Sequence, residues 1–134
     1  MPHAYKVPLL PIRVIHRDLK FHVRNVTRGT SIGYAIDIAE SSAARRTGLL
    51  KHHKLDLGSG LWITPCESVH TFFMRFAIDL IYIDRKRRVR GVVRALRPWR
   101  MSICLFAHSV LELPPGTIDS TNTQKGDELE LLQV

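Results

Sequence analysis

A chain of 134 residues that is 45% hydrophobic and 24% charged is long enough to bury a core and lies far from the composition of disordered proteins. Its two cysteines exclude a disulfide framework, and they lack the paired spacing of a structural zinc module, so we expect neither a metal nor a cofactor. The formal net charge of +8 favours anionic partners without deciding the function.

Residues 1–19 are predicted to form an extended or poorly ordered arm, because Pro2, Pro8 and Pro11 interrupt them. They lack the apolar core of a signal peptide, and no run in the chain approaches the roughly eighteen apolar residues of a membrane-spanning helix. We therefore expect a cytoplasmic protein with no integral membrane segment and a single compact domain over residues 20–134.

Two alternating segments open the predicted domain, with a turn at residues 27–31 between them. Residues 20–26 place Phe21 and Val23 on one face, which predicts the first strand of a hairpin. The second strand is predicted to share one face among Ile32, Tyr34, Ile36 and Ile38. The only strong helix candidate follows at residues 40–53, with Ser41 or Ser42 as its cap.

The middle of the chain contains the densest apolar run. Residues 61–64 are predicted to be extended, and every even-numbered residue after His70 is apolar as far as Tyr82. That period predicts one half-buried strand from His70 to Tyr82. A turn at residues 84–87 and a return strand at residues 89–95, with its arginines facing solvent, should follow.

Residues 110–113 and 128–132 are predicted to form further strands, with a helical turn near Ser120. Many short strands with close turn signals predict an α+β fold that is mostly β. We expect a small antiparallel barrel-like or sandwich sheet of seven to eight short strands with one covering helix.

Five motifs resemble the bacterial and archaeal family known as domain of unknown function 192. They are SAARRTGLL from Ser42, GLWITPC from Gly60, SVHTFFMRFAID from Ser68, LRPWR from Leu96, and SVLELPPGT from Ser109 followed by KGD from Lys125. The resemblance covers about Arg28 to Val134 and implies a compact mixed domain dominated by strands. It implies no catalytic residue, because the family has no established activity. The chain departs from the family in lacking an export signal, in a turn at residues 85–87 without glycine, and at Ala77, where proline is usual.

The least ordinary polar side chains gather between Pro65 and Asp79. Arg75 and Asp79 lie on the mixed face of the predicted strand, where a neighbouring strand can add the ring of Trp99. Such a set would form a polar pocket with an aromatic wall, suited to a small polar or anionic ligand. The simpler alternative is a structural salt bridge from Asp79 to an arginine. The candidate pocket residues are Cys66, His70, Arg75, Asp79 and Trp99.

Cys66 and His70 also allow an enzymatic interpretation, because an adjacent imidazole can convert a thiol to its reactive thiolate. Cys104 and His108 repeat the spacing, but residues four apart on a strand are separated by roughly 13 Å, which argues against a shared metal ion. The catalytic residues therefore stay unknown. The alternative to the enzymatic interpretation is that Cys66 packs at the end of a loop.

A basic segment follows the predicted strand, with eight basic residues and one acid between Asp84 and Arg100. Its arginines, with Trp99 as a stacking ring, are candidates for phosphate contacts. Nucleic acid is a less favoured partner, because no recognised nucleic-acid module is present and a charge run is usually a solvated face. The candidate anion-binding residues are Arg88, Arg90, Arg94, Arg97 and Arg100.

These patterns favour non-enzymatic binding of a small polar or anionic ligand, or of a protein partner, in a pocket near Pro65–Asp79. A thiol-dependent enzyme built on Cys66 and His70 is the first alternative. Binding of a polyanion or nucleic acid through residues 85–100 is the second.

Overall fold

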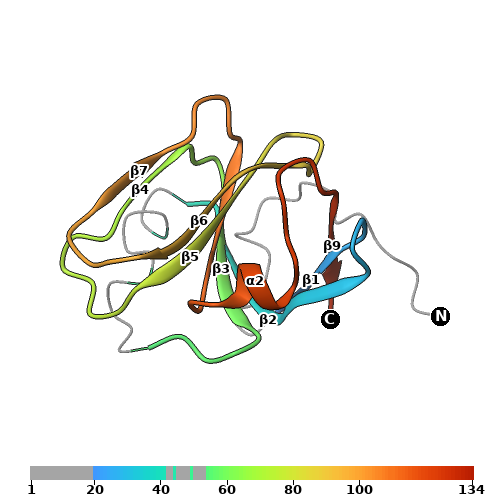
Figure 1. The fold of residues 1–134 in the computed structure, drawn as a ribbon, viewed down its shortest axis with the longest axis horizontal. Helices are drawn as coiled ribbons and strands as arrows, with labels where there is room; N and C mark the ends of the chain where they lie inside the picture. Colours follow the sequence, from blue (N-terminus) through green and yellow to red (C-terminus); the bar gives the residue numbers. More distant parts are fainter. Residues whose placement is uncertain (1–19, 42–43, 45–48, 50–53) are drawn as a thin grey trace.

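The computed structural model describes residues 20–41, 44, 49 and 54–134, and these residues form nine strands and one short helix (Figure 1). The elements are β1 (Phe21–Asn25), β2 (Thr30–Ala39), β3 (Ser59–Ile63), β4 (Ser68–His70), β5 (Ile78–Ile83), β6 (Val89–Leu96), β7 (Met101–Ile103), β8 (Ser109–Leu113), α2 (Thr117–Ser120) and β9 (Leu129–Gln133).

Seven strands form one curled sheet in the order β6-β5-β8-β3-β2-β1-β9, and β4 and β7 form a second, two-stranded sheet. Strands β2 and β3 pair in parallel, whereas the other pairs are antiparallel. The edge strands β6 and β9 meet at one end, where Arg88 bridges Glu128. The predicted fold class is confirmed, with nine strands instead of seven or eight because β4 and β7 are too short to show a clear period.

A buried carboxylate fastens this junction between the two ends of the sheet. Asp127 accepts hydrogen bonds from the Asn25 side-chain amide at 2.9 Å, from Arg28 Nε at 3.1 Å and from the Gln124 backbone amide at 2.9 Å. Burial alone would raise the pKa of Asp127, but the hydrogen bonds from Arg28, Asn25 and Gln124 outweigh it and lower that pKa. The carboxylate thus holds the end of β1 to the start of β9.

The predicted hairpin is confirmed as β1 and β2, but its alternation is interrupted. The register shifts between Phe21 and Val23 show a β-bulge or irregularity in the pairing. Ile32 and Ile36 are therefore buried while Tyr34 is exposed, so the prediction that they share one face is wrong. The Tyr34 ring instead covers Gly58, where an added Cβ would come within 2.3 Å of a ring atom.

The two faces of the curled sheet pack into two hydrophobic clusters. The cluster on one face includes Ile81 and Leu111, and the cluster on the other includes Leu80 and Val110 together with Val69 of β4. All residues of β5 and β8 are buried, as expected for strands covered on both faces. The β4–β7 sheet therefore covers the second face of the curled sheet.

The predicted single strand from His70 to Tyr82 is wrong, because the chain turns between β4 and β5. Thr71 is fully buried and donates its hydroxyl to the carbonyl of Arg97 at 2.6 Å. It also accepts from the Arg100 backbone amide at 2.9 Å, so residue 71 is fixed against the turn after β6. Phe73 then adopts a left-handed conformation with φ of 66°, which an extended strand does not allow.

The helical turn predicted near Ser120 is confirmed as α2. Most of the helix predicted at residues 40–53 lies outside the described residues. At its start, the Ala44 backbone amide donates to Ser41 Oγ at 3.0 Å, which is the contact expected of a serine cap.

Candidate functional site

Strand β7 carries its apolar side chains outward. Met101 and Ile103 are exposed, whereas Ser102 between them faces the curled sheet and accepts a hydrogen bond from the Tyr82 hydroxyl at 2.8 Å. The alternation continues beyond the strand, since Leu105 is also exposed. An alternating strand normally turns its apolar face to the core, so β7 presents to solvent the face that a sequence pattern would bury.

Three aromatic residues stand in strained turns beside this strand. Phe73, Trp99 and Phe106 have φ values of 66°, 64° and 67°, in the left-handed region that bulky side chains rarely adopt. Each such conformation costs of the order of 1–3 kcal/mol, yet all three rings are exposed. The rings of Phe73 and Trp99 contact each other, with centroids 4.7 Å apart. Burial of these rings in the domain therefore does not offset the strain of their backbone conformations.

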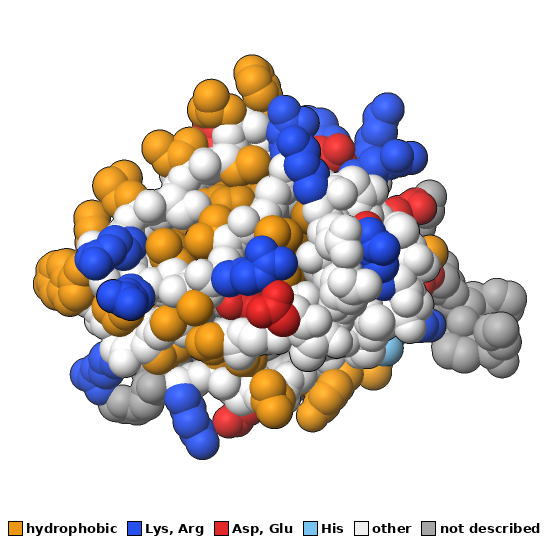
Figure 2. All heavy atoms as spheres, in the orientation of Figure 1, with side chains coloured by type: hydrophobic (Ala, Val, Ile, Leu, Met, Phe, Trp, Pro, Cys, Tyr) orange, Lys and Arg blue, Asp and Glu red, His pale blue; other side chains and the backbone are white. Residues whose placement is uncertain are grey.

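Six side chains on β7 and in the turns beside it form a group that we call the apolar ridge, and they are 55% to 78% exposed. They account for six of the ten exposed large hydrophobic residues in the described part of the chain, so they form a concentration rather than a scatter. Figure 2 shows hydrophobic side chains with Lys and Arg among them along the edge where Figure 1 places β4 and β7. The apolar ridge consists of Phe73, Trp99, Met101, Ile103, Leu105 and Phe106.

Arginines are fixed against the apolar ridge by backbone contacts. Arg90 Nε donates to the Leu105 carbonyl at 2.9 Å, and its guanidinium carbon lies 5.5 Å from the centroid of the Phe106 ring. Arg100 lies beside Trp99, donating from Nη1 to its carbonyl at 3.3 Å. These contacts hold cationic groups at the border of exposed apolar atoms.

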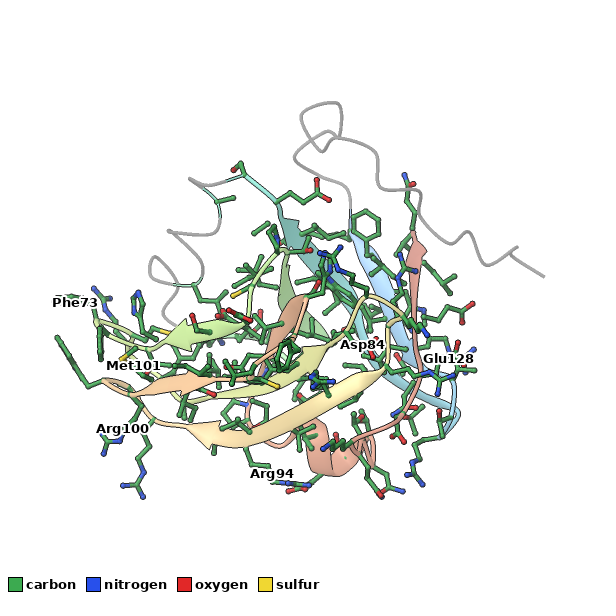
Figure 3. All side chains as sticks on the ribbon, turned by 90° about the horizontal axis from the view of Figure 1, so that it is seen from above. Phe73, Asp84, Arg94, Arg100, Met101 and Glu128 are labelled. Atoms are coloured by element: carbon green, nitrogen blue, oxygen red, sulfur yellow. The ribbon has the colours of Figure 1, made fainter. Side chains whose placement is uncertain are left out.

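The structure divides the predicted anion-binding arginines into two groups. Arg97 and Arg100 lie in the turn that carries Trp99, and Arg90 adjoins Phe106. Arg94 instead forms an ion pair with Asp119 at 2.7 Å, and Arg88 lies at the junction of β6 and β9 opposite Glu128. Figure 3 shows Arg100 with Phe73 and Met101 at one end of the molecule, with Arg94 and Glu128 elsewhere.

The five predicted pocket residues are placed in four different settings. The His70 ring stacks on Phe72 with ring centroids 5.0 Å apart, and the Phe72 ring in turn lies 6.0 Å from Trp99, so Phe72 connects His70 to Trp99 beside the ridge. Arg75 is exposed in the turns before β5. Cys66 donates its thiol to the Ser68 carbonyl at 3.0 Å.

Asp79, the fifth predicted pocket residue, points into the fold. It is buried, and its two carboxylate oxygens accept hydrogen bonds from the backbone amides of Ala95 at 2.8 Å and Ile118 at 2.9 Å. The carboxylate thereby connects the start of β5 to the end of β6 and to α2. Its contacts are those of a side chain that supports the fold.

The thiol-enzyme hypothesis makes a separate prediction about Cys66. An imidazolium that stabilises the thiolate would lower the pKa of the thiol, so the alkylation rate of Cys66 should titrate below the ordinary thiol range and return to it in His70→Ala. The rate of iodoacetamide modification against pH, measured in Cys104→Ser to isolate Cys66, checks this. A Cys66 rate that titrates normally and ignores His70→Ala contradicts the hypothesis.

A buried acid that no sequence pattern indicated lies on the face of the curled sheet that the β4–β7 sheet covers. Glu112 of β8 pairs with Leu61 and Leu80 on the flanking strands. It is buried, and its Oε2 atom has no hydrogen-bond partner among the residues that the structure describes. Burial raises the pKa of Glu112 to about 7. Burial also raises the pKa of Tyr82 to about 12, with smaller contributions from Cys66, Cys104 and Glu112, so these acidic groups share one region.

The family model DUF192, described as "Uncharacterized ACR", matches residues 23–131, which include all the strands except the ends of β1 and β9. The chain belongs to the DUF192 family. The resemblance predicted from its motifs is thereby confirmed. No helix in the described part of this DUF192 chain is long and apolar enough to cross a membrane.

The DUF192 chain has relatives in archaea and a structural neighbour in a bacterium. A UPF0127 protein of Thermococcus sibiricus is 34% identical over 112 residues, covering 79% of this chain and 71% of that protein. A UPF0127 protein of Pyrococcus furiosus is 32% identical over 113 residues, covering 79% and 94%. The crystal structure of a protein of unknown function from Novosphingobium aromaticivorans matches with a TM-score of 0.71 at 19% identity, covering 82% of each chain. At that identity the match shows the fold alone.

Proposed function

We propose that this DUF192 chain is a non-enzymatic binding domain that recognises an anionic partner through the apolar ridge and Arg90, Arg97 and Arg100. The outward alternation of β7 carries the proposal, because it exposes Met101 and Ile103 where the same pattern would ordinarily build a core. Large exposed apolar patches mark interaction sites, and cationic groups at their border favour a negatively charged partner.

The ridge supports binding better than the predicted pocket does. Asp79 uses both carboxylate oxygens on backbone amides, so a small ligand would have to compete with contacts that hold the fold. His70 and Trp99, by contrast, remain beside solvent at the ridge. The proposal includes a cytoplasmic setting, because two cysteines in a chain of 134 residues make no disulfide framework, which suits a reducing compartment.

The dye anilinonaphthalene sulfonate tests this proposal without assuming a natural partner, since it joins an apolar ring system to an anionic group. We expect the folded protein to bind the dye at the ridge with an increase in fluorescence. Phe106→Ser should weaken binding about tenfold, because a large apolar side chain contributes about 1.5–3 kcal/mol when buried.

Leu57→Ser is the matched control, since Leu57 is 79% exposed against 78% for Phe106 but lies in the turn before β3. Its dye affinity should equal that of the unaltered protein. Equal losses in Phe106→Ser and Leu57→Ser, or dye affinity unchanged by Phe106→Ser, would remove the ridge as the binding surface.

A further inference from the structure

We propose that the partner of the apolar ridge is the surface of an anionic lipid bilayer, on which the domain docks peripherally with the ridge inserted among the headgroups. This inference rests on the proposed function, and it names the partner of the same surface. Its support is the chemistry of the ridge side chains, their arrangement on separate loops, and the distribution of charge around them.

The ridge is half aliphatic, which favours acyl chains over nucleic-acid bases. Met101 and Ile103 project from β7, and Leu105 projects from the turn that follows it. These side chains offer no flat face on which a base can stack, whereas proteins that bind single strands use aromatic platforms along a charged groove. Aliphatic and aromatic side chains together are the set that enters the boundary between headgroups and acyl chains.

Two of the aromatic tips lie side by side, since the ring centroids of Phe73 and Trp99 are 4.7 Å apart, and Phe106 follows at the other end of β7. Phe73 belongs to the turns before β5, Trp99 to the turn between β6 and β7, and Phe106 to the turn after β7, and all three use left-handed backbone conformations. Figure 3 shows Phe73 and Met101 projecting at the same end of the molecule. A tryptophan in such a position suits the interface in particular, since its ring is apolar and its N–H can stay hydrated.

The charges around the ridge match a negative bilayer. Arg90, Arg97 and Arg100 adjoin the apolar atoms, while Glu67 is the one exposed acid within residues 65–107. Figure 3 places Asp84 and Glu128 away from the end that carries Phe73. The field of the molecule would therefore orient the ridge toward anionic lipid before any apolar contact forms.

Vesicles of phosphatidylcholine with a minority of phosphatidylserine, compared with pure phosphatidylcholine vesicles, test the inference in a flotation assay. We expect the full chain to float with the anionic vesicles, to do so less as salt is raised, and to stay in solution with the neutral ones. Binding should shift Trp99 emission to shorter wavelength, because Trp99 is 55% exposed whereas Trp62 is already buried. The variant Trp99→Phe should abolish the shift.

Variants assign the contact to named side chains. Phe106→Ser should weaken vesicle partitioning about tenfold, and Arg100→Gln about fivefold. The controls are Leu57→Ser, matched in exposure, and Arg88→Gln, which removes the same charge at the junction with β9. Both controls should partition like the unaltered protein.

The outcomes separate this inference from the proposed function. Equal binding to neutral vesicles, or binding that the controls weaken as much as the ridge variants, overturns the lipid proposal. Dye binding at the ridge without vesicle binding overturns it too while leaving the proposed function intact, and transfer of a labelled single-stranded oligonucleotide to the ridge would then make nucleic acid the partner. If Phe106→Ser binds the dye and the vesicles as tightly as the unaltered protein does, both the proposed function and the lipid proposal are overturned.

Discussion

Asp79→Ala is expected to lower the free energy of unfolding by about 3–5 kcal/mol, because it leaves two backbone donors without an acceptor. A hydrogen bond to a charged group contributes about 1.5–3 kcal/mol, and the lower part of that range applies to the partly buried bond from Ala95. The donors are the backbone amides of Ala95 and Ile118. Urea denaturation followed by circular dichroism measures the change. Ala95 adds to the cost, since its φ of 47° is a conformation that the hydrogen bond to Asp79 helps to hold.

Asp119→Ala is the matched control for Asp79→Ala. Asp119 lies on α2 and pairs with Arg94, but its side chain is 70% exposed, and exposed ion pairs contribute about 0–1 kcal/mol. A loss below about 1 kcal/mol in Asp79→Ala, or losses of equal size in the two variants, would contradict the supporting role of Asp79.

Glu112 makes the stability of the domain depend on pH in an unusual direction. Burial raises its pKa from 4.5 to about 7 in the folded state, so the folded state holds the proton more tightly than the unfolded chain does. Its contribution is therefore most favourable below pH 4.5 and is lost as pH rises toward about 7. The loss should amount to about 3 kcal/mol over this window, since one pKa unit corresponds to about 1.4 kcal/mol.

Glu112→Gln isolates this contribution, because glutamine has the shape of the acid without its proton equilibrium. The comparison is needed because burial lowers the pKa of His22 and of His108. The stability that these two histidines contribute is therefore lost as pH falls below their ordinary pKa of 6.5. Asp127, whose pKa is lowered, loses its contribution only as pH falls below 3.8. The difference between Glu112→Gln and the unaltered protein should therefore grow with pH while these other contributions cancel.

Free energies of unfolding measured from pH 4 to pH 8 check the prediction for Glu112. Parallel profiles for Glu112→Gln and the unaltered protein would show that Glu112 ionises normally in the folded state. A matched control is Glu128→Gln, since Glu128 is exposed and its replacement leaves the buried Glu112 side chain in place.

Much of the fold could be predicted from local patterns. The hairpin of β1 and β2, the strands β5 and β6, and the final strand β9 all follow from alternation and turn residues, because each lies next to its partner or has one clearly apolar face. The parallel pairing of β2 with β3 could not be predicted in this way, since it joins segments whose neighbours are set by the whole sheet. The turn at Thr71 was hidden because the apolar period continues through it.

The site was harder to predict, because a strand with alternating side chains can turn either of its two faces to the core. Met101, Ile103 and Leu105 alternate with Ser102 and Cys104, but the run is too short to predict a strand or to say which of its faces meets the core. The orientation of β7 is instead set by Tyr82 of the curled sheet, whose hydroxyl donates a hydrogen bond to Ser102. Asp79 shows the converse, since an acid on an apolar strand suggested a ligand site while its amide partners are distant in sequence.

The pairing of β1 with β9 sets an order of events for folding. Phe21 lies opposite Gln133, so the first described strand completes its ladder only with the last one, and the junction of β6 with β9 waits for the same segment. On the ribosome, the edges of β1 and β6 would stay unpaired until synthesis reaches β9. Long-range pairing of this kind slows folding, and during that interval the exposed edges would be open to association with other chains.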